Sequence, residues 1–225
     1  VLVYRSNQGS NMKRTNWKVL ELFGGSCSFS NVAKENGNKA FTSDFKDFDG
    51  IDYVTDILDF DMSKVPFKPD IIWASPPCTT FSIASCGHHW TPDKQPKTDA
   101  CRKGIAIAKK TLELIELFDP EFYFIENPRG LLRKMDFMQN IPRTTISYCQ
   151  YEMDKPVNER RMKPTDIWTN NLERWIPKAI CKNGAPCHVA APRGSRTGTQ
   201  GLKNNFERSK IPEQLCLEIL NSCYK

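Results

Sequence analysis

The sequence lacks long apolar runs and a disulfide framework. No stretch approaches the roughly 20 apolar residues of a membrane span, and no secretory signal pattern opens the chain. Its nine cysteines are odd in number and irregularly spaced, which argues against a secreted domain held by disulfides. The 225 residues are 39% hydrophobic and 26% charged, which predicts one cytoplasmic domain with its own core and no membrane attachment.

Zinc-type spacing is also missing. Cys181 precedes Cys187 and His188, and a second group of cysteine and histidine lies at 86–89, but neither contains a CxxC pair. We therefore expect no metal site.

Positive charge is concentrated near the end of the chain. The net charge is +6, and residues 155–225 hold 13 Lys and Arg against 6 Asp and Glu. A polyanionic partner is one interpretation and a solvated basic face is the other, and charge alone does not separate them.

The apolar patterns alternate between strands and helices. Such alternation predicts a mainly parallel sheet with helices on both faces, in which ligands bind at the carboxyl ends of the strands. We expect residues 82–97 to form a loop, because this stretch is polar and contains Gly and Pro. The predicted strands lie at 17–23, 39–43, 51–55, 70–74, 122–125 and 166–169, and the predicted helices lie near 29–36, 105–118 and 211–220.

A Gly24-Gly25 turn and two acids follow the first strands. Glycines let a backbone approach a ligand closely, although many α/β proteins have such a turn without a ligand. Asp44 could hold ribose hydroxyls and Asp56 an adenine amino group, and the alternative for each is a solvated acid or a helix cap.

The sharpest features follow two buried strands. Pro76 and Pro77 would hold the Cys78 thiol rigidly at the edge of the sheet, where the alternative is a structural cysteine. Glu126 and Asn127 should open on the same edge. The carboxyl is a candidate general acid, and the alternative is a turn with a satisfied carboxylate.

In this order the motifs resemble those of the DNA (cytosine-5) methyltransferase family. The resemblance runs from about Trp17 to Thr169 and includes the final helix. The matching segments are Glu-Leu-Phe-Gly-Gly-Ser-Cys-Ser-Phe-Ser at 21–30 (cofactor turn), Pro76-Pro77-Cys78 with Phe81-Ser82 (catalytic motif), Glu126-Asn127-Pro128 (Glu-Asn-Val motif) and Ile211-Pro212 with Leu215 (last motif).

The resemblance implies a mechanism for the catalytic residues. Cys78 would add as a thiolate to carbon 6 of a cytosine flipped out of the duplex. Glu126 would hold the N3 edge and supply a proton, and Asn127 would orient the loop that carries Cys78. Arg160 or Arg161 resembles the arginine that contacts the base and activates the thiol, although the spacing of its motif is altered.

The resemblance also implies a Rossmann-like fold that binds S-adenosylmethionine, a double-stranded DNA substrate and a monomeric enzyme. It divides the chain into a tail (1–16, of which 1–11 are foreign or disordered), a catalytic domain (17–169), a short recognition region (170–205) and a returning helix (206–225). The residues expected to bind cofactor are Phe23, Gly24, Gly25, Ser26, Asp44, Phe45, Asp56, Ile57 and Pro76, and those expected to bind DNA are Ser82, Ser85, Arg193 and Arg196.

The chain departs from the family in several places. Cys27 and Ser28 stand where glycines are usual, Thr79 replaces Gln, and the short recognition region predicts a site of about two bases. The run at 163–169 is similar to that of phage-encoded members, which predicts the cytoplasm of a bacterial or phage-infected cell. Three alternatives remain open: an RNA cytosine-5 methyltransferase, a catalytically inactive DNA-binding relative, and transfer of another group from a modified sulfonium.

Overall fold

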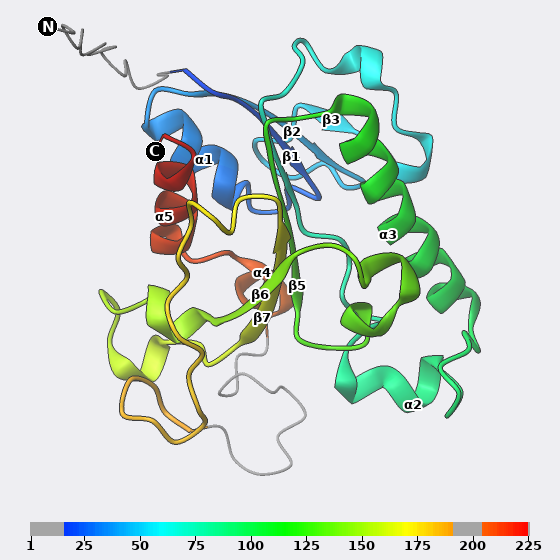
Figure 1. Ribbon diagram of the computed structural model, residues 1–225, viewed down its shortest axis with the longest axis vertical. Coiled ribbons are helices and arrows are strands. Elements are labelled where there is room, and N and C mark those ends of the chain that lie inside the picture. Colours follow the sequence, from blue (N-terminus) through cyan, green and yellow to red (C-terminus); the bar gives the residue numbers. More distant parts are fainter. Residues whose placement is uncertain (1–15, 191–203, 225) are drawn as a thin grey trace, which may run out of the picture.

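A single seven-stranded sheet organises the molecule. The computed structural model describes residues 16–190 and 204–224. The strand order is β3-β2-β1-β4-β5-β7-β6, with β1–β5 parallel and β7 antiparallel to both β5 and β6 (Figure 1). The strands are β1 (Lys18–Leu22), β2 (Lys39–Asp44), β3 (Tyr53–Val54), β4 (Ile71–Ala74), β5 (Phe122–Pro128), β6 (Arg143–Ser147) and β7 (Pro164–Thr169).

Helices cover both faces of this sheet (Figure 1). On one face lie α1 (Ser28–Glu35) and α5 (Glu213–Cys223), and on the other lies the long α3 (Asp99–Phe118). Two short helices, α2 (Cys86–His89) and α4 (Asn205–Ser209), are also present. The predicted Rossmann-like α/β fold with a mainly parallel sheet is confirmed.

Strand β1 shows why the sequence folds this way. Its side chains alternate between the faces: Val19 packs with α1 and α5, whereas Leu20 and Leu22 pack on the α3 side. All three are buried, as expected of a central parallel strand covered on both sides. On the α1 side, Phe29 stacks on Trp73 with ring centroids 4.9 Å apart, so the first helix is fixed against the sheet directly after the turn.

The final helix joins the same core. Leu215 and Ile219 of α5 are fully buried in the cluster that contains Phe29 and Trp73. The Ile211 amide donates to Ser28 Oγ (3.2 Å) just before α5 begins. The start of α5 therefore lies beside the start of α1, directly after the turn that follows β1.

Two segments differ from the sequence expectations. Strand β6 was not predicted, because its Thr144-Thr145 pair breaks any apolar run and only β7 pairs with it. The expected loop at 82–97 contains a 3-10 turn and α2, because Ser82 caps the turn (Ala84 N to Oγ, 3.2 Å). The Trp90 indole donates to Thr80 O (2.6 Å) and ties this segment to the core.

Other expectations fall outside the described part of the chain. These are the tail at 1–15 and the recognition arginines Arg193 and Arg196. Among the described helices, none combines the length and the hydropathy that a bilayer crossing requires.

Candidate active site

The turn after β1 is sharply bent. Phe23, Gly25 and Cys27 all have left-handed backbone angles (φ 61°, 47° and 50°), which is costly for the two residues with side chains. A Cβ on Gly24 would lie 2.9 Å from Ile51 Cδ1, so the end of the Ile51 side chain packs closely on this turn. The Gly25 amide donates to Asp44 Oδ2 (3.1 Å), which joins the turn to the end of β2.

Glu21 holds the start of α1 from inside β1. The N-cap residue, Cys27, makes no side-chain cap hydrogen bond. The buried Glu21 carboxylate instead accepts from the Phe29 amide (3.3 Å) and the Ser30 amide (2.7 Å). Burial raises the pKa of Glu21 to about 7, against the opposing effect of these hydrogen bonds.

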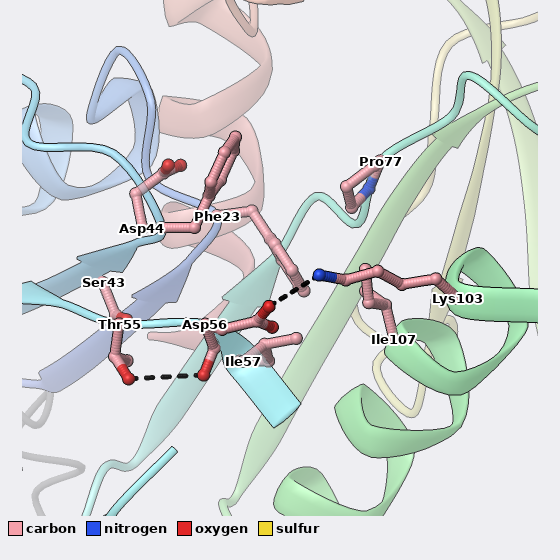
Figure 2. A pocket seen from close by; sticks show the side chains of 10 residues that line it. Phe23, Ser43, Asp44, Thr55, Asp56, Ile57, Pro77, Lys103 and Ile107 are labelled. Carbon is pink, nitrogen blue, oxygen red and sulfur yellow. Dashed lines mark hydrogen bonds and ion pairs between the residues drawn. The ribbon is translucent and has the colours of Figure 1, made fainter. Parts of the chain in front are cut away.

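A cavity of about 150 Å³ opens beyond this turn, between the ends of β1 and β2 and the N-terminal half of α3 (Figure 2). Five of the nine residues predicted to bind cofactor line it: Phe23, Asp44, Phe45, Asp56 and Ile57. The wall is completed by Ser43, Thr55, Pro77, Lys103 and Ile107. The cavity therefore combines aromatic and aliphatic groups with two carboxylates.

The other four predicted residues have different positions. Gly24 and Gly25 form the bend beneath the cavity, and Pro77 lines it in place of Pro76. Ser26 faces a separate polar hollow of about 340 Å³ between α1 and the start of α5.

Asp56 faces the cavity, but both of its carboxylate oxygens already accept hydrogen bonds from the protein. One carboxylate oxygen accepts from the Leu58 amide (3.1 Å), and the other pairs with Lys103 Nζ (2.8 Å; Figure 2). The lysine hydrogen bond is the main reason why the pKa of Asp56 is lowered. Asp56 thus caps a turn, which was its alternative role, and also lines the cavity.

The Cys78 loop is held by the neighbouring strand. Strands β4 and β5 pair in parallel with Ala74 opposite Ile125, so both end at the same edge. Asn127 Nδ2 donates to Pro76 O (2.8 Å) and fixes the backbone two residues before the thiol. Pro77 lines the cavity directly before Cys78, so the thiol-bearing loop borders that cavity.

Burial raises the pKa of the Cys78 thiol. The charge of Lys163 acts against this shift, whereas Glu126 adds to it and Arg208 opposes it more weakly. A cation near the thiol favours the thiolate, which is the nucleophilic form.

Glu126 is buried in this site with only 4% exposed surface. Its Oε1 accepts from the Tyr148 hydroxyl (2.8 Å) and pairs with Lys163 Nζ (3.4 Å). Burial raises the pKa of Tyr148, so its hydroxyl stays protonated and donates. Among the described residues all hydrogen bonds to this carboxyl fall on Oε1, which leaves Oε2 for another donor.

The two arginines predicted to activate the thiol have other partners in the structure. The buried Arg161 pairs with Glu152 and donates to the Glu207 and Lys210 carbonyls, and Arg160 donates to Met153 and Lys155. Both guanidinium groups thus form hydrogen bonds with these residues.

Lys163, directly before β7, supplies the cation near Cys78 and Glu126. It also lies 4.6 Å above the centre of the Tyr148 ring. Sequence reasoning missed this role because Arg161 and Lys163 lie in a tight turn just before β7 (Lys163 N to Arg161 O, 2.9 Å), which gives them different neighbours, and no local pattern marks which cation faces the thiol.

Two loops meet tightly beside Cys78. The Leu131 amide donates to Phe81 O (2.7 Å), and a Cβ on Gly130 would lie 2.2 Å from that oxygen. Of the two serines predicted to bind DNA, Ser82 caps the turn described above and the Ser85 hydroxyl donates to Thr79 O. Neighbouring Ile83 is 65% exposed.

Comparison with known proteins identifies the family. The model of the C-5 cytosine-specific DNA methylases matches residues 18–153, more than half of the chain. The chain belongs to this family. The match begins at β1 and contains the bent turn, the Cys78 loop and the Glu126-Asn127 strand end, and it stops before Lys163.

Individual relatives agree with this assignment. The chain is 28% identical to a probable DNA (cytosine-5)-methyltransferase of Frog virus 3 (isolate Goorha), over 92% of this chain and 100% of the viral protein. It is 27% identical to the type II methyltransferase M.HpaII of Haemophilus parainfluenzae, over 58% of this chain and 34% of M.HpaII. The chain thus spans the whole viral relative but about a third of the bacterial one.

A solved structure is also similar. The Entamoeba histolytica methyltransferase EhMeth aligns with a TM-score of 0.48 and 15% identity, covering 69% of this chain and 53% of the other.

Proposed function

We propose that this methylase family member transfers a methyl group from S-adenosylmethionine to carbon 5 of cytosine in double-stranded DNA, through a covalent bond to Cys78. One observation carries the proposal: Cys78, Glu126 and Lys163 lie together at the sheet edge, directly beside the cavity lined by Pro77. A thiol, a carboxyl and a cation are the groups that this reaction requires.

The cavity suits the adenosine part of the cofactor. Phe23, Phe45 and Ile57 offer apolar surfaces for a planar ring, and a cavity of this size accommodates an aromatic ring. Asp44 is positioned to accept from ribose hydroxyls, since it is anchored by the Gly25 amide. When bound, S-adenosylmethionine supplies an electrophilic methyl group as a sulfonium.

The residues at the edge would act on the cytosine ring. Carbon 5 of cytosine is a weak nucleophile, and addition of the Cys78 thiolate to carbon 6 would convert the ring to an enamine with a nucleophilic carbon 5. The free Oε2 of Glu126 would hold the N3 edge and deliver a proton there, while Asn127 keeps the loop in place. Lys163 would favour the thiolate before the attack. After methylation a water or a base would take the carbon 5 proton, the Cys78 thiolate would leave from carbon 6, and Glu126 would take back the N3 proton.

The substrate base must leave the duplex to reach Cys78. Ile83 is exposed on the segment after Cys78 and would contact the opened duplex. With only residues 170–205 for recognition, a site of about two bases follows, and Arg196→Ala would then remove the sequence preference.

Expression in a host without cytosine methylation tests this function. Nucleosides from host DNA and RNA are quantified by mass spectrometry for the unmutated chain, for Cys78→Ala, and for the control Cys86→Ala, a cysteine of α2. We expect 5-methylcytosine in DNA with the unmutated chain and the control, and none with Cys78→Ala. The mark in RNA alone, an added group of another mass, or no mark from soluble protein would overturn the proposal.

The covalent step has its own test. In DNA that contains 5-fluorocytosine, the substituent at carbon 5 cannot leave as a proton, so the adduct is not released. We expect a complex that survives denaturing electrophoresis with the unmutated chain and with Cys86→Ala. Trapping by Cys78→Ala would show that another residue is the nucleophile.

A further inference from the structure

Three thiols and one imidazole that the proposed reaction does not use converge in a second cluster. They come from Cys149, in the turn after β6, and from Cys181, Cys187 and His188, in the long segment after β7. Their ligand atoms all lie within 4.8 Å of one another. Cys149 and His188 are buried, and the other two are half-buried.

The distances match tetrahedral metal coordination better than a disulfide. The Sγ atoms of Cys181 and Cys187 are 3.3 Å apart, far longer than the roughly 2.05 Å of an S–S bond. Cys187 Sγ lies 3.9 Å from Cys149 Sγ. In a tetrahedral zinc site with Zn–S of about 2.3 Å, sulfurs lie about 3.8 Å apart, so a small adjustment admits the ion.

The imidazole points into the same space. His188 Nδ1 lies 3.3 Å from Cys187 Sγ and 3.7 Å from Cys181 Sγ. Its other nitrogen, Nε2, is buried without a hydrogen-bond partner among the described residues, so hydrogen bonding outside the cluster does not explain its orientation. Three thiolates and one imidazole form a common structural zinc set.

Local backbone geometry brings these ligands together. A turn closed by the Ala185 amide to Lys182 O (3.1 Å), with Gly184 in the left-handed region (φ 88°), folds Cys187 back towards Cys181. The Cys181 amide donates to Ser147 Oγ (3.0 Å), which places this turn beside the end of β6.

A neighbouring side chain supports the sulfurs. Gln150 Nε2 lies 3.3 Å from Cys187 Sγ and 3.9 Å from Cys149 Sγ, where an N–H donor stabilises thiolate charge. Lys178 Nζ, 3.1 Å from Gln150 O, adds a positive charge close by. Such outer donors are typical of metal sites.

We propose that Cys149, Cys181, Cys187 and His188 bind one structural Zn²⁺ that fixes residues 176–190 to the catalytic domain. These residues have no helix or strand, and Ile176 and Ile180 are exposed, so apolar burial does little to hold them. The site is separate from the Cys78 chemistry. It replaces the sequence expectation of no metal site with a specific ligand set.

Metal analysis of the full chain, purified without chelators, tests the site. We expect about one zinc per chain, which is lost in His188→Ala and in Cys187→Ser. The matched controls are Cys86→Ser, a half-buried cysteine outside the cluster, and His188→Cys, which completes a Cys₄ set. Both controls should retain zinc, and Gln150→Ala should weaken zinc affinity by about 10- to 100-fold.

Cobalt substitution makes the test independent of variant folding. We expect Co²⁺ added to the metal-stripped, reduced chain to give thiolate charge-transfer and strong tetrahedral d–d absorption, both reversed by Zn²⁺. A zinc-free chain without these bands would overturn the proposal. An intact mass two hydrogens low under non-reducing conditions, abolished by Cys187→Ser, would overturn it in favour of a disulfide. None of these measurements depends on methyl transfer.

Discussion

The parallel and antiparallel halves of the sheet carry their chemistry differently. In the parallel half, β1, β2, β4 and β5 each end in a functional group of the site, and those groups meet because parallel strands end at a common edge. In the antiparallel half, Lys163 directly precedes β7, and Tyr148 and Cys149 follow β6. These groups meet their partners only through strand pairing and long loops.

Sequence motifs reveal the position of a site most directly in a parallel sheet. Parallel strands turn a linear order of motifs into a spatial cluster, so the positions of Cys78 and Glu126 could be anticipated. The antiparallel half contributes side chains that bind the Glu126 carboxylate: Lys163 and Tyr148 both contact its Oε1. The zinc ligands likewise come from segments more than 30 residues apart.

Separating the two loops beside Cys78 should have the largest effect. In Gly130→Ala the new methyl group would collide with Phe81 O, so the Cys78 loop would shift relative to Glu126. We expect methyl transfer to fall about 100-fold, as for a small misplacement of catalytic groups. The control is Gly87→Ala, where a Cβ meets nothing within 4 Å. Steady-state kinetics of both variants checks this, and equal activities would contradict it.

Removing the cation of the antiparallel half should have the next largest effect. Loss of the Lys163 charge raises the pKa of Cys78 further, so less thiolate is present at neutral pH. We expect Lys163→Gln to slow adduct formation about tenfold at pH 7 and to move its alkaline rise to higher pH. Lys163→Arg should restore the profile, and Arg160→Gln should leave it unchanged. An unaltered profile in Lys163→Gln would refute this role.

Glu21, in β1 of the parallel half, should make the free energy of unfolding depend on pH. Its pKa is raised from 4.5 to about 7 in the folded protein, so the folded state binds the proton more tightly than the unfolded state. Its stabilising contribution is complete below pH 4.5, declines as pH rises to about 7, and then stays constant. Urea unfolding from pH 4.5 to 8 should show this decline, and Glu21→Gln should flatten it. If the free energy of unfolding of the two proteins showed the same pH dependence, Glu21 would not be its source.

The smallest effect should come from the ion pair at the cavity mouth. Lys103 and Asp56 retain 57% and 35% exposed side-chain surface, and such pairs contribute little. We expect Lys103→Ala to leave the thermal midpoint unchanged and to alter S-adenosylmethionine affinity, measured by calorimetry, by less than about threefold. A tenfold loss of affinity would mean that Lys103 itself contacts the cofactor.

Much of the parallel half could be predicted from the sequence. Buried strands read as apolar runs, and five of the predicted cofactor residues do line one cavity. The pairing of Asp56 with Lys103 could not be predicted in this way, because the two residues are 47 positions apart in the sequence. Strand β6 escaped prediction because an edge strand with Thr144 and Thr145 carries no apolar period.

The sequence by itself determined the α/β alternation, the family and the position of the thiol, because these depend on local periodicity and on short motifs. Which cation faces Cys78 depends on the tertiary structure, since Arg161 pairs with Glu152, whereas Lys163, only two residues later, pairs with Glu126. The tertiary structure also decided that Cys149 meets Cys181, Cys187 and His188, because their spacing carries no metal signal until the chain folds back on β6.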